Sequence, residues 1–192
     1  GWAQLFRSLR QATQREGLIV DVRYNRGGHT SQLVIEQLAR RPIGWAMGRG
    51  LGSFETYPDN SPCGPVVCVT NENAGSDGDI VNAAAQALGI GPVVGVRTWG
   101  GVVGIDGRFD LVDGTVVTQP RFAFWLQGKE WGVENHGVDP DIEVEIAPAE
   151  LLHEAQSDRQ LDRAIEEALT RLETQPAAGP PPMPPPKVRP TP

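Results

Sequence analysis

Three short apolar runs constrain the fold of this chain more than any other feature of its sequence. The runs cover residues 18–22, 65–70 and 93–97, and each is short enough for one strand. Apolar residues that follow one another without alternation are typical of strands buried on both faces. Between the runs, residues 31–40 and 79–88 have helical spacing, and the second of these segments stops at Gly89. This alternation predicts an α/β domain.

The pattern changes after residue 101. Residues 102–146 read as short strands and turns, with hairpin signals at Asp106-Gly107 and Asp113-Gly114. A last helix is expected from Ser157, where Ser-Asp-Arg-Gln forms a capping box. Its expected buried stripe consists of Leu161, Ala164, Ile165, Ala168, Leu169 and Leu172. The second part of the domain should therefore be rich in antiparallel strands and end in a helix.

The two ends of the chain differ from its body. The chain begins without Met, directly on apolar residues at helical spacing: Trp2, Leu5, Phe6, Leu9 and Ala12. We therefore expect a piece of a longer protein, from which a leader sequence could have been lost. Residues 175–192 contain 9 of the 17 prolines, which predicts a disordered tail of polyproline II character. The alternative is a ligand for a proline-reading domain. The folded unit should span residues 1–174.

Composition excludes several classes of function. With 17 basic and 24 acidic residues the net charge is −7, which argues against nucleic acid as a partner. No run of 18 apolar residues is present, so no membrane span is expected. Two cysteines, Cys63 and Cys68, are too few for a disulfide scaffold or a four-cysteine zinc site, and we expect no metal or cofactor. We expect a cytoplasmic protein.

Polar loops follow the first two apolar runs. Residues 21–29 come directly after the first, and residues 70–79 come after the second and before a helix. Ligands bind at the carboxyl ends of strands in open α/β sheets, so both loops lie where a site is expected. Ser76 stands at a tight turn from strand to helix, an arrangement that can expose a nucleophilic hydroxyl. The alternative for Ser76 is an ordinary helix N-cap.

The first loop contains consecutive glycines, Gly27 and Gly28. Their backbone N–H groups could form one half of an oxyanion hole, and the start of the second helix could form the other half. The alternative for the glycines is a plain turn. Trp99, Gly100 and Gly101 follow the third run and either line a substrate groove or simply pack.

Four motifs together resemble the tail-specific protease and tricorn protease family. They are Asp-x-Arg-x-Asn-x-Gly-Gly from Asp21, Asn-Glu-x-Ala-Gly-Ser-Asp-Gly-Asp from Asn71, Arg-Thr-Trp-Gly-Gly from Arg97 and Val-Glu-Asn-His-Gly-Val-Asp-Pro-Asp-Ile from Val133. The resemblance covers roughly residues 15–172. It implies a serine endopeptidase that acts on peptides or unfolded proteins as a homo-oligomer. It also implies a crotonase-like or ClpP-like spiral core of ββα units.

The resemblance also assigns roles to residues. It implies that Ser76 is the nucleophile, and that the amides of Asp77 and Gly28 form the oxyanion hole, with Gly27 as the alternative to Gly28. Glu134 would support the general base through a second serine. In the family the base is a histidine on an upstream segment, which this chain does not include. Without a base a serine hydroxyl is a poor nucleophile, so we expect the chain alone to be nearly inactive.

Alternatives to this interpretation remain. His29 and His136 could lie near Ser76 and, with His153, are the only histidines, although a hydrogen-bonded or solvated role suits each of them. Residues 37–54 contain no acidic side chain, so the family's preference for Lys or Arg before the cut is not evident. A run of alternating acidic residues, residues 139–145, is expected to be a solvated strand face. A peptide-binding or assembly module and a crotonase-type acyl-CoA enzyme are the rival functions.

Overall fold

The computed structural model describes residues 2–13, 15–49, 53–147, 157–183 and 185. Its centre is a four-stranded parallel sheet in the order β1-β4-β5-β8. The strands are β1 (Leu18–Asp21), β4 (Val66–Thr70), β5 (Val93–Gly95) and β8 (Ile142–Glu143). The expected α/β class and the first three strands are confirmed, although β5 ends earlier than the apolar run does.

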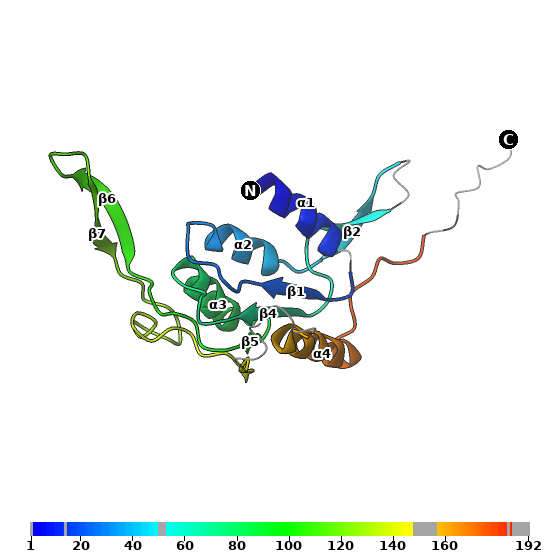
Figure 1. Ribbon diagram of the computed structural model, residues 1–192. Helices are drawn as coiled ribbons and strands as arrows, with labels where there is room; N and C mark the ends of the chain where they lie inside the picture. The colour runs from blue at the N-terminus through cyan, green and yellow to red at the C-terminus, as the bar shows by residue number, and fades with distance from the viewer. Residues whose placement is uncertain (1, 14, 50–52, 148–156, 184, 186–192) are drawn as a thin grey trace.

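Helices cover both faces of this sheet (Figure 1). They are α1 (Trp2–Ala12), α2 (Ser31–Leu38), α3 (Asp77–Ala87) and α4 (Arg159–Thr174). The strand β4 is buried throughout and sends alternate side chains to opposite faces. Val66 and Cys68 join the core that contains Leu9 and Leu38, whereas Val67 and Val69 join the core that contains Ala164 and Ala168 of α4. The sheet is thus covered by α1, α2 and α3 on one side and by α4 on the other.

A third, smaller core attaches the segment after β5 to α3. It consists of Ala83, Val102, Val133 and Val138, with Ile80, Phe124 and Leu126 at its margin. From this segment the hairpin of β6 (Gly104–Asp110) and β7 (Val116–Phe122) projects away from the sheet and its helices (Figure 1). We call this hairpin the arm.

Of the two turns predicted from Asp-Gly pairs, one is confirmed and the other is wrong. Asp113-Gly114 lies at the turn of the arm, where the N–H of Leu111 donates to the carbonyl of Thr115 over 2.9 Å. Asp106-Gly107 is not a turn and lies within β6, where the register shifts between Asp106 and Phe109. A bulge in a strand uses the same flexible residues as a turn, so the dipeptide alone does not separate the two.

A second hairpin, which the sequence did not predict, consists of β2 (Gly44–Met47) and β3 (Phe54–Tyr57). The expectations for α4 also need correction. Its N-cap is Asp158, whose side chain accepts from the N–H of Leu161 over 3.0 Å, rather than Ser157. Ile165 and Leu169, assigned to the buried stripe, are exposed, because α4 meets the sheet through its small residues. No described helix is both long and apolar enough to cross a bilayer.

Candidate active site

Ser76 is the N-cap of α3 and has a backbone conformation that non-glycine residues rarely adopt, with φ of 55° and ψ of −113°. Such a conformation costs about 1–3 kcal/mol and persists only where its surroundings hold it. Here the N–H of Ser76 donates to Oδ2 of Asp79 over 2.7 Å, and the N–H of Gly75 donates to the carbonyl of Asn25 over 2.8 Å. The tight turn that exposes the half-buried Ser76 side chain is therefore fixed from both sides.

The glycines of the first loop lie against this turn. A Cβ added at Gly27 would lie 2.9 Å from Cβ of Ser76, and Gly27 has φ of +121°. The N–H of Gly27 is already engaged, since it donates to Oδ1 of Asn25 over 3.0 Å. Within the described part of the chain, the N–H groups of Gly28 and Asp77 donate no hydrogen bond. Two unengaged backbone donors thus belong to the two loops that meet at Ser76.

The side chain of Asp77 joins the two loops. Its Oδ2 accepts from the N–H groups of Thr30 and Ser31 over 2.5 and 2.9 Å, and its Oδ1 accepts from Oγ of Ser31 over 2.5 Å. Burial alone acts to raise the pKa of Asp77, but the hydrogen bonds from Ser31 and Thr30, together with the charge of His29, outweigh it and lower the pKa. The carboxylate therefore attaches the start of α2, and the glycines before it, to the start of α3.

A residue that the sequence analysis overlooked organises the rest of the site. Asp79 is fully buried, and besides the N–H of Ser76 its carboxylate accepts from Thr98 Oγ1 and from the N–H groups of Gly100 and Gly101. It thereby ties the loop after β5 to the turn at Ser76. A local signal was available, because Ser followed three residues later by an acidic residue is a capping-box pattern.

Trp99 lies beside the turn, as the groove hypothesis requires. The side chain is 67% exposed, and the Trp99 N–H donates to the carbonyl of Ala74 over 2.9 Å. A Cβ added at Gly75 would lie 2.5 Å from the indole ring, so the ring rests on the backbone next to Ser76. Trp99 also borders a hollow of about 550 Å³ with Tyr24, His136 and Glu145. In contrast, Gly100 and Gly101 serve Asp79 and have no N–H left to offer a ligand.

Glu134 is attached to the same loop from its other end. Its Oε2 accepts from the N–H groups of Val102 and Val103 over 2.7 and 2.8 Å, and the N–H of Asn135 donates to the carbonyl of Gly100 over 2.7 Å. No bond to Oε1 is found among the described residues. The loop from Gly100 to Val103 therefore connects Glu134 to Asp79 and, through Asp79, to Ser76.

Neither described histidine is hydrogen-bonded to Ser76. His29 is exposed, and Nε2 of His136 contacts Oδ2 of Asp139 over 2.9 Å. The described residues include no hydrogen bond from either imidazole to Ser76, and His153 lies outside them. Nor does the described part of the chain gather three or more His, Cys, Asp or Glu side chains in a metal-binding cluster.

Comparisons with known proteins agree with the motifs. The model of peptidase family S41 matches residues 1–144. Tricorn protease homolog 1 of Streptomyces coelicolor is 68% identical over 148 residues, which are 77% of this chain and 14% of that protein. Tricorn protease of Thermoplasma acidophilum is 50% identical over 152 residues, which are 79% of this chain and 14% of that protein.

A solved structure matches as well. A crystal structure of tricorn protease aligns with a TM-score of 0.76 and 51% sequence identity, and the match covers 82% of this chain and 15% of that one. The chain thus spans about 14% of the length of the curated relatives named above.

Proposed function

This chain belongs to peptidase family S41, and on that premise we propose that it is the nucleophile-bearing part of a tricorn-like serine endopeptidase. One observation carries the proposal. Ser76 stands at a strained N-cap where two loops meet, and each of these loops has a backbone donor, the N–H of Gly28 or of Asp77, that no described group uses. A serine hydroxyl with paired backbone donors close by is the arrangement that acyl transfer needs.

The reaction would proceed through an acyl-enzyme. Oγ of Ser76 attacks the carbonyl carbon of the peptide bond while a general base removes the hydroxyl proton. The negative charge that forms on the carbonyl oxygen accepts hydrogen bonds from Gly28 and Asp77. When the tetrahedral intermediate collapses, the C–N bond breaks and the amine leaves with the proton. Water then attacks the acyl carbon, the bond from that carbon to Oγ of Ser76 breaks, and the carboxylic acid product leaves as the hydroxyl regains its proton.

We propose that the base comes from an upstream segment of the same protease. The engagement of Gly27 by Asn25 favours Gly28 as the oxyanion donor, and the unengaged Oε1 of Glu134 suits the proposed contact with an upstream serine. Loss of a catalytic base typically costs on the order of 10⁴–10⁶ in rate. The chain alone should therefore be nearly inactive.

The remaining features of the assembly are proposals of the same kind. The substrate would be a peptide or an unfolded protein, seated against Trp99 and the hollow beside it. The enzyme would be a cytoplasmic homo-oligomer, with the exposed side of α4, at Ile165 and Leu169, as one candidate surface for assembly. The sheet and its helices would be part of a crotonase-like spiral of ββα units.

A fluorophosphonate probe tests the proposal in the longer protein that includes the upstream segment. We expect the probe to label that protein, Ser76→Ala to abolish both labelling and peptide cleavage, and Ser53→Ala, which changes another described serine outside the site, to leave them intact. Labelling and cleavage that survive Ser76→Ala would refute the assignment of Ser76 as the nucleophile. A crotonase-type acyl-CoA enzyme, which uses only the paired amides, predicts no labelling at all.

A non-catalytic peptide-binding module is the second candidate, because no described histidine is bonded to Ser76. It predicts peptide binding without labelling even when the upstream segment is present.

A further inference from the structure

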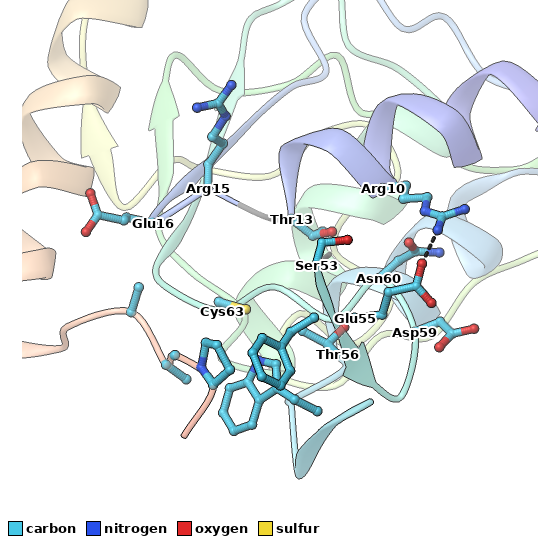
Figure 2. Close-up of a pocket in the computed structure, with 16 residues that line it drawn as sticks. Arg10, Thr13, Arg15, Glu16, Ser53, Glu55, Thr56, Asp59, Asn60 and Cys63 are labelled. Carbon is cyan, nitrogen blue, oxygen red and sulfur yellow. Dashed lines mark hydrogen bonds and ion pairs between the residues drawn. The ribbon is translucent and has the colours of Figure 1, made fainter. Parts of the chain in front are cut away.

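A second concave feature lies at the other edge of the sheet. It is a groove of about 500 Å³, bordered by the end of α1, the β2–β3 hairpin and the residues that precede β1 and β4 (Figure 2). Glu16, before β1, and Cys63, before β4, both line it. Ser76 and its partners follow the carboxyl ends of the strands, so the groove and the candidate active site are at opposite edges.

Aromatic side chains form one wall of this groove. Trp45 of β2 and Phe54 of β3 line it, together with Thr56. Because Trp45 pairs with Thr56 and Met47 pairs with Phe54, the two aromatic residues are diagonal neighbours on one face of the hairpin. An ion pair between Arg10 and Glu55, drawn as a dashed line in Figure 2, lies at the rim.

The start of the proline-rich segment is seated at the same groove. Ala177, Ala178, Gly179 and Pro180 line it, and the N–H of Ala178 donates to the carbonyl of Cys63 over 2.8 Å. A Cβ added at Gly64 would lie 3.3 Å from Cβ of Ala177, so this part of the tail packs closely on the body. Residues 180–186 are all proline except Met183.

We propose that this groove is a receptor for the start of the chain's own proline-rich segment, residues 180–183, which lies along Trp45 and Phe54. Prolines favour polyproline II and lose little conformational freedom on binding, and aromatic-lined grooves are the usual receptors for such segments. Because the segment begins at the rim, its effective concentration there is on the order of millimolar, so even a weak contact is populated.

The geometry of polyproline II fits a contact along one edge of the segment. With about three residues per turn, such a helix can contact a wall along one edge and leave the rest of its surface in solvent. Residues 180–183 are all exposed, so the contact we propose is one-sided. The contact lies at the sheet edge away from Ser76. It therefore does not depend on the peptidase proposal, and either can fail alone.

Cys63 provides a reporter of this contact in the intact chain. Its thiol lines the groove, and burial raises its pKa. Cys68 is an internal control, because burial raises its pKa to about 12 and it should react only in unfolded protein. We expect replacement of Pro180, Pro181 and Pro182 by Ser to accelerate alkylation of Cys63 several-fold while Cys68 stays silent. An unchanged rate for Cys63 would overturn the proposal.

Trp45→Ala tests whether the aromatic wall and the prolines of the tail contact each other. Alkylation should again accelerate, but adding the proline substitutions to Trp45→Ala should then have little further effect, because both changes break one contact. Fully additive effects would contradict that contact. Trp131→Ala removes an indole that is 61% exposed elsewhere in the chain and should leave the rate unchanged.

A peptide provides the direct test. A synthetic peptide of residues 176–192, added to the full-length proline-substituted protein, should slow alkylation of Cys63 in a saturable manner. A peptide with the same charges and with serine in place of every proline should not. Equal protection by both peptides, or by neither, would contradict recognition of polyproline II.

Discussion

At the scale of single residues, Asp79 determines whether the loop after β5 stays attached to Ser76. Its buried carboxylate accepts hydrogen bonds from the N–H groups of Ser76 and Gly100 and from Thr98 Oγ1. In Asp79→Asn an amide donor would face some of these donors, and unsatisfied buried groups cost about 1–3 kcal/mol each. We expect the free energy of unfolding to fall by about 3 kcal/mol in urea denaturation.

Asp113→Asn is the matched control, since Asp113 is an exposed aspartate in the turn of the arm and accepts a hydrogen bond only locally, from Thr115. It should change the free energy of unfolding by less than about 1 kcal/mol. If Asp79→Asn were equally mild, the site would not depend on this carboxylate.

Asp77 makes the stability of the folded chain depend on pH in the acidic range. Its pKa is lowered in the folded chain, because the hydrogen bonds from Ser31 and Thr30 outweigh the opposing effect of burial. The folded state therefore binds this proton less readily than the unfolded state, and the stabilisation is complete above the ordinary value of about 3.9. It is lost as the pH falls from that value through the lower pKa of the folded state.

Asp77→Asn should accordingly make the free energy of unfolding less sensitive to pH in this acidic range, while Glu173→Gln, at an exposed residue of α4, should keep the wild-type slope. Chemical denaturation at a series of pH values measures both. Parallel curves for the wild type and Asp77→Asn would show that the carboxylate is not held by these bonds.

Some of these site residues could be predicted from the sequence and others could not, and the difference has a physical reason. Ser76, Asp77 and Gly28 lie in short runs whose signals are local: a strand, a glycine-rich turn and a helix start. The role of Asp79 depends on Thr98 and Gly100, about twenty residues away along the chain, and no local spacing states that such loops meet. The role proposed for Glu134 came from the family resemblance alone. Its hydrogen bonds from Val102 and Val103 also join segments that are far apart along the chain.

At the scale of elements, the site requires a loop between β1 and α2 that approaches α3 closely. Gly27 makes this possible, since its φ is +121° and an added Cβ would lie 2.9 Å from Cβ of Ser76. Gly27→Ala should therefore strain the loop by about 1–3 kcal/mol and shift the amide of Gly28 away from Ser76. Displacement of a catalytic group by about 1 Å can cost on the order of 10² in rate.

Gly114→Ala is a control that separates the effect of backbone strain from the effect of displacing the Gly28 amide. Gly114 also has a positive φ, of +80°, but an added Cβ would meet nothing within 4 Å. Both variants should unfold at a lower urea concentration than the wild type, and only Gly27→Ala should slow fluorophosphonate labelling of the longer protein. Equal labelling rates in the two variants would argue against a role for the first loop in the oxyanion hole.

Elements were predictable where they lie within an apolar run that is bounded by polar loops. The strands β1, β4 and β5 lie in continuous apolar runs, and β4 is fully buried. The strand β2, Gly-Trp-Ala-Met, is apolar but half-buried or exposed and lacks β-branched residues, and β3, Phe-Glu-Thr-Tyr, shows no clear alternation, so neither was recognised. The stripe of α4 was too wide for a related reason, because the helix contacts the sheet through Ala164 and Ala168 and leaves Ile165 and Leu169 outside.

At the scale of the whole molecule, the arm stands out because it projects from the sheet and its helices and exposes many large apolar side chains. Its exposed large apolar side chains are Ile105, Phe109, Leu111, Val112, Val116, Val117 and Phe122. Soluble monomers rarely expose contiguous apolar surface of this kind unless a partner covers it. The arm is therefore a second candidate surface for the proposed homo-oligomer, besides the exposed side of α4.

We expect the arm to contribute more to self-association than α4 does, because it exposes more apolar side chains. Phe109 and Val117 are directly opposite each other in the hairpin, and burying such side chains is worth about 1.5–3 kcal/mol each. Replacing both by Lys should weaken association at least about tenfold, since about 1.4 kcal/mol corresponds to that factor. Sedimentation velocity over a range of concentrations measures this, with circular dichroism to verify the fold. The matched pair Ile165→Lys and Leu169→Lys on α4 should have the smaller effect, and the reverse order would assign the interface to α4.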